Sequence, residues 1–213
     1  PMKARKILVS LAALALVAAI SIGGTIAYLT SQDQVVNTFT VGKVNIVLNE
    51  AAANPDGSLI ENADRVKANS YKLLPGHTYN KDPMVTVKGG SEDCYVKMTV
   101  TFSKASELDA IFASTGGADM ISIFKGYDNT NWILKNVSKD ANANTRTYEF
   151  WYKEVVESPT ADKALDALFD QIVVPGTITK EQLATIEGMT ITVNAYAIQA
   201  DGFATADLAW AKF

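Results

Sequence analysis

The sequence is poor in the residues that most often carry catalysis and bind metals. Its 213 residues include one cysteine, Cys94, and one histidine, His77. A single cysteine excludes an intrachain disulfide and any zinc site built from two or four cysteines. A single histidine excludes the motifs that place two histidines on one metal, among them the HExxH helix of many zinc peptidases. It also leaves the serines with no other imidazole to act as their base.

Positive charge is scarce as well. Nineteen lysines and arginines stand against 23 aspartates and glutamates, so the formal net charge is −4. A nucleic-acid-binding protein needs a basic patch to displace counterions from phosphates, and we therefore expect no nucleic-acid partner. Only 20% of the residues are charged and 48% are hydrophobic, which favours a folded core over disorder.

The longest uncharged stretch lies near the N-terminal end. A short basic region ending at Lys6 precedes Ile7–Leu29, which has 23 residues and no charge. About 20 apolar residues suffice to span a bilayer. The stretch is therefore either a signal peptide that is cleaved or an N-terminal anchor with its basic end in the cytoplasm.

Small residues near the end of this stretch favour cleavage. Ser21, Gly23 and Gly24 interrupt the apolar run, and Thr25 and Ala27 fit positions −3 and −1 of a cut after Ala27. We expect a signal peptide over residues 1–27 and a mature chain that begins at Tyr28. The chain is exported under either interpretation, and it contacts the membrane only if the leader is retained.

Alternation of apolar and polar residues dominates the mature chain. The clearest case is Cys94–Phe102, in which five apolar side chains share one face. Further strands are expected at 44–48, 84–87, 132–137, 148–155, 172–174 and 189–198, and short helices at 106–112, 161–169, 179–187 and 204–212. No βαβ rhythm is present. The pattern predicts one all-β domain over residues 28–213, with small helical insertions and two antiparallel sheets packed face to face.

Few residues remain as candidates for catalysis or for metal binding. His77 reads as an exposed loop residue, with a mixed site involving Asp82 or Glu92 as the alternative. Cys94 alternates with apolar residues, so we expect a buried and unreactive thiol. Lys88–Ser91 resembles a hairpin turn. We therefore predict no catalytic residue, no metal site and no cofactor, and hence no enzyme.

Two further groups of residues allow more than one interpretation. Asp162, Asp166 and Asp170 would form a stripe on the helix expected at 161–169, either as a solvated face or as a weak Ca²⁺ site or inter-subunit cation bridge. Trp132 and Trp151 would pack in the core or line a binding patch.

Three segments of the sequence resemble the TasA/camelysin family of exported Gram-positive proteins, whose precursors carry a SipW-type signal peptide. The first runs from Gly23-Gly24-Thr25-Ile26-Ala27-Tyr28 through Asn37-Thr38-Phe39-Thr40-Val41-Gly42-Lys43 to Ile46. The second comprises Leu74-Pro75-Gly76, Pro83–Val87 and Tyr95-Val96-Lys97. The third is Ala195–Phe203 with Ala209-Trp210. Residues from about 103 to 157 match no motif of the family.

The resemblance implies a jelly-roll-like β-sandwich that is secreted into the extracellular or biofilm matrix or onto the cell surface. It also implies a fibre subunit that assembles by donor-strand exchange, in which an N-terminal strand completes the sheet of the next subunit. The donor would lie within Tyr28–Val41, with Leu29, Val35, Phe39 and Val41 as anchors. The expected partners are copies of the same chain or related matrix subunits, and the signal peptidase during export. The segment could instead fold back on its own domain.

Two other functions remain open. Camelysin gives the family a metallo-endopeptidase label, but this chain lacks a recognisable zinc motif. A monomeric surface adhesin or binding module would use exposed aromatic side chains instead.

Overall fold

The computed structural model describes residues 42–114 and 123–213. The leader, the expected cleavage site and the expected donor-strand anchors lie outside the described residues. These are Thr25, Ala27 and Tyr28 at the cleavage site, and Leu29, Val35, Phe39 and Val41 in the donor segment.

The largest sheet has four antiparallel strands in the order β10-β4-β7-β6. Its strands are β10 (Ile191–Gln199), β4 (Cys94–Ser103), β7 (Thr145–Tyr152) and β6 (Trp132–Asp140). Alternating apolar residues form β4, as expected, and its inward side chains from Val96 to Phe102 are completely buried. This strand therefore forms the centre of the core.

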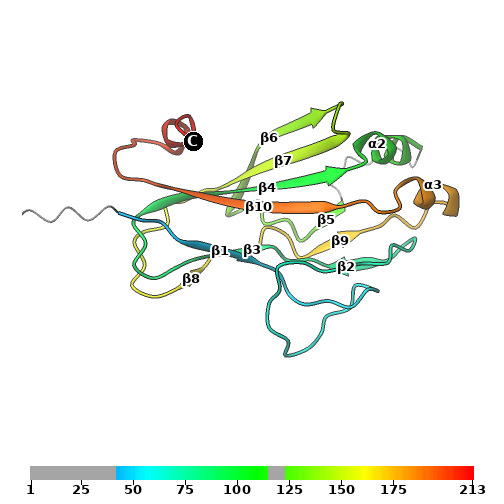
Figure 1. Ribbon diagram of the computed structural model, residues 1–213, viewed down its shortest axis with the longest axis horizontal. Coiled ribbons are helices and arrows are strands. Elements are labelled where there is room, and N and C mark those ends of the chain that lie inside the picture. The colour runs from blue at the N-terminus through cyan, green and yellow to red at the C-terminus, as the bar shows by residue number, and fades with distance from the viewer. Residues whose placement is uncertain (1–41, 115–122) are drawn as a thin grey trace, which may run out of the picture. The chain divides into compact units, whose positions relative to one another are not determined.

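Two smaller antiparallel sheets lie on the other side of the core (Figure 1). The first has the order β1-β3-β8, with strands β1 (Ile46–Asn49), β3 (Met84–Val87) and β8 (Lys163–Ala164). The second has the order β2-β9-β5, with strands β2 (Thr78–Asn80), β9 (Gln171–Val173) and β5 (Phe124–Lys125). The all-β prediction is confirmed, and the layer that faces the four-stranded sheet is divided between these two.

The turn at Lys88–Ser91 connects two sheets and does not form a hairpin. It follows β3 and precedes β4, but β3 pairs with β1 and β8 whereas β4 pairs with β10 and β7. Gly90 has φ = 78°, which glycine adopts without steric cost. The predicted turn is therefore correct and the predicted hairpin is wrong.

The described part of the chain also contains three short helices: α2 (Ala105–Ser114), α3 (Lys180–Thr185) and α4 (Ala206–Trp210). The predicted capping box of α3 is present, because Thr179 and Gln182 each accept a hydrogen bond from the other's backbone N–H. All three helices lie where the sequence pattern places a short helix.

The helix predicted over 161–169 is wrong. Lys163 and Ala164 form β8, and the N–H groups of Leu165 and Leu168 donate to the carbonyls of Val85 and Pro83. The helical spacing of the apolar residues arises instead from an extended segment that buries Leu165, Leu168 and Phe169. Backbone pairing with β3 thus overrides the local pattern.

The acidic stripe expected on that helix does not form. Asp162 binds the Lys88 ammonium, whereas Asp166 accepts from the side-chain amide of Asn131. Hydrogen bonds from Lys88 and from the Gly89 N–H lower the pKa of the exposed Asp162 carboxyl. Asp162 and Asp166 therefore have separate local partners.

Candidate assembly site

The strand β10 ends the four-stranded sheet and pairs with β4 on one side only, within the described part of the chain. Its nine residues contain no charge, no proline and no glycine. An unpaired edge of this kind offers backbone N–H and C=O groups to another strand. It is the first component of the candidate site.

The opposite edge, β6, carries features that natural sheets use to prevent strand addition. It contains Lys135, Lys139 and Asp140, and its register shifts by a bulge between Leu134 and Asn136. Charged side chains and bulges both disfavour edge-to-edge pairing. The sheet is therefore asymmetric, with a protected edge at β6 and an uncharged edge at β10.

The core is incompletely covered beside β10. The inward residues of β4 are fully buried, whereas the inward residues of β10, from Ile191 to Ala197, are only partly buried. The four residues of β1 are also only partly buried. Apolar surface along this side of the sandwich thus remains accessible.

A groove follows the start of β10. One part, with a volume of about 850 Å³, lies between residues 68–73 and the segment from α3 to Thr192. A second part of about 220 Å³ lies between the end of β1 and Ile191–Val193. Because Ile191, Thr192, Asn69 and Lys81 line both parts, they adjoin each other along the edge strand.

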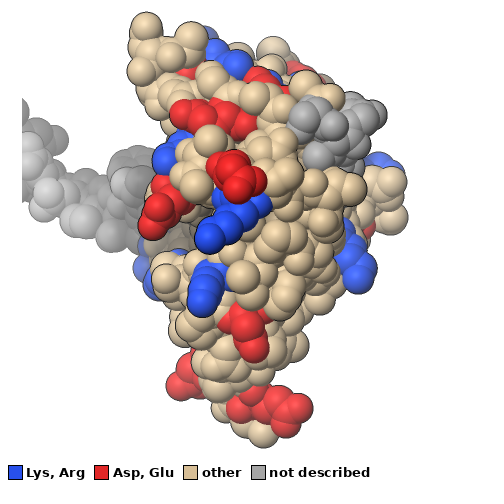
Figure 2. Space-filling view, turned by 90° about the vertical axis from the view of Figure 1, so that its right-hand side faces the viewer, with Lys and Arg blue, Asp and Glu red and all other residues tan. Residues whose placement is uncertain are grey.

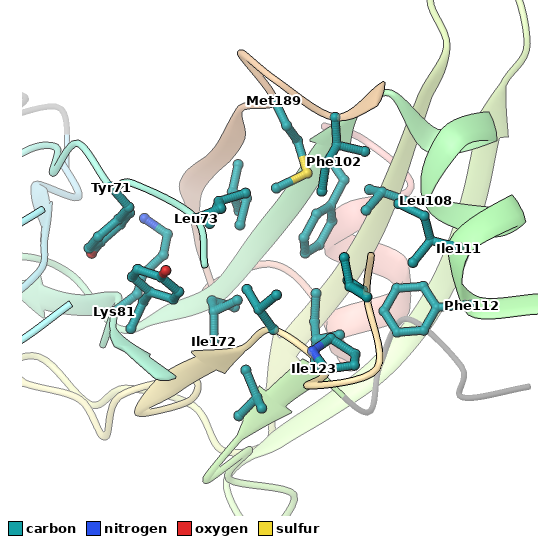
Figure 3. Close-up of a pocket in the computed structure, with 17 residues that line it drawn as sticks. Tyr71, Leu73, Lys81, Phe102, Leu108, Ile111, Phe112, Ile123, Ile172 and Met189 are labelled. Atoms are coloured by element: carbon teal, nitrogen blue, oxygen red, sulfur yellow. The ribbon is translucent and has the colours of Figure 1, made fainter. Parts of the chain in front are cut away.

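The groove adjoins an apolar pocket in the core. Figure 3 shows Leu73, Met189 and Phe102 on one side of this pocket and Ile172 and Ile123 on the other. The space inside it is about 50 Å³, and its lining is almost wholly apolar. A pocket of this kind suits an apolar side chain that enters from the groove.

The floor of the groove contains a buried ion pair. The Lys81 ammonium donates to Glu50 Oε2 at 2.5 Å, and the Asn69 amide donates to Glu50 Oε1 at 2.9 Å. Tyr71 donates its hydroxyl to the carbonyl of Asn80. Burial, followed by the negative charge of Glu50, raises the pKa of Tyr71. The tyrosine therefore stays neutral and acts as a hydrogen-bond donor at physiological pH.

The candidates predicted for metal binding and nucleophilic chemistry lie elsewhere. His77 is exposed, with its ring 6.3 Å from that of Tyr79, and Asp82 is engaged by Arg65 at 2.8 Å. No cluster of three or more potential ligands among His, Cys, Asp and Glu occurs within residues 42–114 and 123–213. Cys94 is fully buried, and this burial raises its pKa to about 11, as its position in β4 predicts.

The two tryptophans proposed for a binding patch have different positions. Trp132 is fully buried in the core and donates through Nε1 to the Asp166 carbonyl, so it does not line a surface. Trp151 is partly exposed on the outer face of the sheet, and its ring lies 6.1 Å from that of Trp210.

Sequence reasoning did not find the groove. Its walls come from residues 68–73 and from α3, which are distant in sequence and carry no motif. The one available signal was the uncharged sequence of β10 compared with the charged sequence of β6.

No protein-family model matches the chain, and no curated protein and no solved structure is significantly similar to it. Among the helices that the structure describes, none is long and apolar enough to cross a bilayer.

Proposed function

We propose that the chain is an exported structural subunit of an extracellular matrix or of a surface fibre. In this proposal the groove beside β10 accepts an extended segment from a neighbouring subunit. The resemblance of the leader and of the first strand to the TasA/camelysin family motivates the proposal.

The observation that carries it is the combination at β10 of an uncharged open edge with an incompletely covered core. An added strand would satisfy the backbone groups of the edge and place alternate side chains over the apolar surface. The main-chain bonds would supply affinity, and the pocket between Met189 and Phe102 would select the side chain that fits.

The proposed donor is the segment Tyr28–Val41 of another copy. It contains five large apolar residues, the four expected anchors and Val36, and a single charge, Asp33. Removal of the leader after Ala27 would free its N-terminal end, so cleavage would permit assembly only after export. A segment that adds to the sheet edge of the next copy links the copies head to tail. Head-to-tail contacts form an open filament when the rotation from one subunit to the next does not close a ring.

Polymerisation of two purified chains tests the donor. The mature chain, residues 28–213, should form filaments visible by negative-stain microscopy, and the chain 43–213 should remain monomeric at the same concentration. If both chains stay monomeric at high concentration, the fibre proposal is wrong.

A pair of point variants tests the acceptor. Met189→Lys places an ammonium in the apolar part of the groove and should prevent filament formation while leaving a folded monomer. Val137→Lys is the matched control, because it adds the same charge on the protected edge β6, where Val137 is 46% exposed. If Met189→Lys polymerises as readily as Val137→Lys, the groove is not the acceptor.

A further inference from the structure

The outer face of the four-stranded sheet carries two complete rows of polar side chains, seven of them Thr, Ser or Asn and one of them Glu149. Cross-strand pairing places one residue from each of the four strands in each row. The first row is Thr192, Thr101, Thr147 and Ser138, and the second is Asn194, Thr99, Glu149 and Asn136. We call these eight residues the hydroxyl face.

The hydroxyl face is accessible. None of its eight residues is buried, and Thr192, Ser138, Asn194 and Asn136 are exposed. The strands place neighbouring side chains about 4.8 Å apart across the sheet and about 6.7 Å apart along each strand. Seven of the eight side chains carry a hydroxyl or amide group that can donate and accept hydrogen bonds, and the eighth, Glu149, is a carboxylate that accepts them. The hydroxyls of Thr101 and Thr147 lie 2.9 Å apart and bond to each other.

An aromatic wall borders this array. The next row of the sheet contains Tyr196, Lys97 and Trp151, and the C-terminal segment packs onto it with Trp210 and Phe213. The ring of Phe213 lies 5.3 Å from that of Tyr196, and the residue Phe213 is 63% exposed. Figure 1 shows this C-terminal segment with α4 at one end of the sheet. Trp210 is buried and Tyr196 and Trp151 are partly buried, so Phe213 is the exposed ring that the wall places beside the polar floor.

The floor has almost no net charge. Its one carboxylate, Glu149, lies 3.5 Å from the Lys97 ammonium and accepts a hydrogen bond from Trp151 Nε1 at 2.7 Å. Lys97 in turn lies 4.5 Å from the centroid of the Trp210 ring. Elsewhere on the domain, at the end shown in Figure 2, basic and acidic side chains are interspersed over a largely uncharged surface.

We propose that the hydroxyl face and its aromatic wall bind a neutral extracellular polysaccharide. Sugar hydroxyls would exchange hydrogen bonds with the threonine, serine and asparagine side chains of the floor. The apolar C–H face of a sugar ring would pack on the negative face of an aromatic ring in the wall. The neutral floor favours an uncharged chain, and the acidic balance of the protein disfavours polyanions.

A second copy of the protein fits this face less well. The two rows offer no large apolar side chain, whereas the fully buried part of a stable protein interface is predominantly apolar. The site is distinct from the acceptor groove apart from Thr192, which lines the groove at the edge of β10 and also begins the first row of the hydroxyl face.

Affinity electrophoresis of the monomeric mature chain tests the proposal. The gels contain hydroxyethyl cellulose, laminarin or dextran as neutral polymers, and polygalacturonate as the anionic comparison. At least one neutral polymer should retard the protein, and polygalacturonate should not. Use of the monomeric fraction makes the result independent of whether the chain polymerises.

Three variants locate the binding surface. Thr99→Val and Thr101→Val keep the shape and the strand preference but remove a floor hydroxyl, and each should weaken binding about 2- to 10-fold. Phe213→Ala removes the exposed ring of the wall and should weaken binding by a similar factor. Thr160→Val is the control, because this exposed residue lies beside the Lys88–Ser91 turn and off the hydroxyl face.

Retardation that falls in the floor and wall variants but not in Thr160→Val supports the proposal. Absence of retardation by every neutral polymer, equal retardation of all variants, or a preference for polygalacturonate overturns it. A concentration-dependent dimer that Thr101→Val abolishes, without polymer binding, also overturns it and identifies a second copy as the occupant.

Discussion

Lys81 and Glu50 form a buried ion pair on the floor of the groove beside β10. The ammonium lies 2.5 Å from the carboxylate, and only 9% and 6% of the two side chains are exposed. Asn69 provides a second donor to Glu50; its side-chain amide also donates to the Ala51 carbonyl, and its Oδ1 accepts from the Ala53 N–H. The pair therefore connects Lys81, which lies between β2 and β3, to Glu50, which directly follows β1.

Replacing one member of this pair should destabilise the fold strongly. Lys81→Met leaves Glu50 charged and buried with only the Asn69 amide, and this should lower the free energy of unfolding by about 3–5 kcal/mol. The double variant Lys81→Met with Glu50→Gln removes the uncompensated charge and should recover part of that loss. Urea denaturation followed by tryptophan fluorescence measures both. A single variant within about 1 kcal/mol of the unchanged protein would contradict the structural role of the pair.

The Cys94 thiol should make stability fall at alkaline pH. Burial raises its pKa from 9.0 to about 11 in the folded state, so the unfolded chain releases this proton first as the pH rises. This difference in pKa does not change the free energy of unfolding below about pH 9. As the pH approaches 11, it lowers the free energy of unfolding by about 2–3 kcal/mol. Denaturation of the protein and of Cys94→Ala between pH 8 and 11 measures it. The tyrosines titrate in both proteins, so the difference in slope isolates the thiol, and parallel pH profiles would show that the thiol does not contribute.

The proposed cleavage of the leader after Ala27 can be tested by substitution at position −1. Ala27→Leu places a large side chain where the peptidase requires a small one, and it should block release of the chain. Mass spectrometry of secreted protein should give a chain that begins at Tyr28 for the unchanged sequence. Ala19→Leu, which adds the same side chain within the apolar region, is the control and should be processed normally. Efficient cleavage of the Ala27→Leu precursor at the same position would show that this site is assigned incorrectly.

The all-β fold was predictable because several strands have one buried and one exposed face. In β4 burial alternates from Val96 onward, and the apolar face identified both the strand and the buried position of Cys94; Tyr95, on the other face, is also buried, in the cluster with Ala209 and Trp210. The helix prediction for 161–169 failed because Leu165, Leu168 and Phe169 are spaced as in a helix, although an extended chain buries them. The spacing of apolar residues within a segment carries no information about hydrogen bonds to a distant strand. Here the backbone hydrogen bonds to β3 decide the conformation.

The groove and the hydroxyl face were not predictable for a related reason. The row that joins Thr192, Thr101 and Thr147 depends on the register of three strands whose residues lie far apart in sequence. Each strand alone shows only polar residues on its outer face, which any half-exposed sheet requires. Only the pairing shows that these side chains align into rows.

The capping box of α3 should support the wall of the groove. Thr179 Oγ1 accepts from the Gln182 N–H at 3.2 Å, and Gln182 Oε1 accepts from the Thr179 N–H at 2.9 Å. Removal of such a cap costs about 1 kcal/mol, so Thr179→Ala should lower the free energy of unfolding by about that amount. Thr177→Ala, an exposed substitution two residues earlier, is the control and should change it by less than about 0.5 kcal/mol.

The same variant should also affect assembly, because Leu183 and Ile186 line the groove and follow directly from this cap. Loosening the first turn of α3 would make the wall less ordered, so a donor strand would have to order it on binding and would bind more weakly. We therefore expect Thr179→Ala to raise the concentration needed for filament formation relative to Thr177→Ala. Equal thresholds, with the expected loss of stability in Thr179→Ala, would show that α3 stabilises the domain without contributing to the acceptor groove.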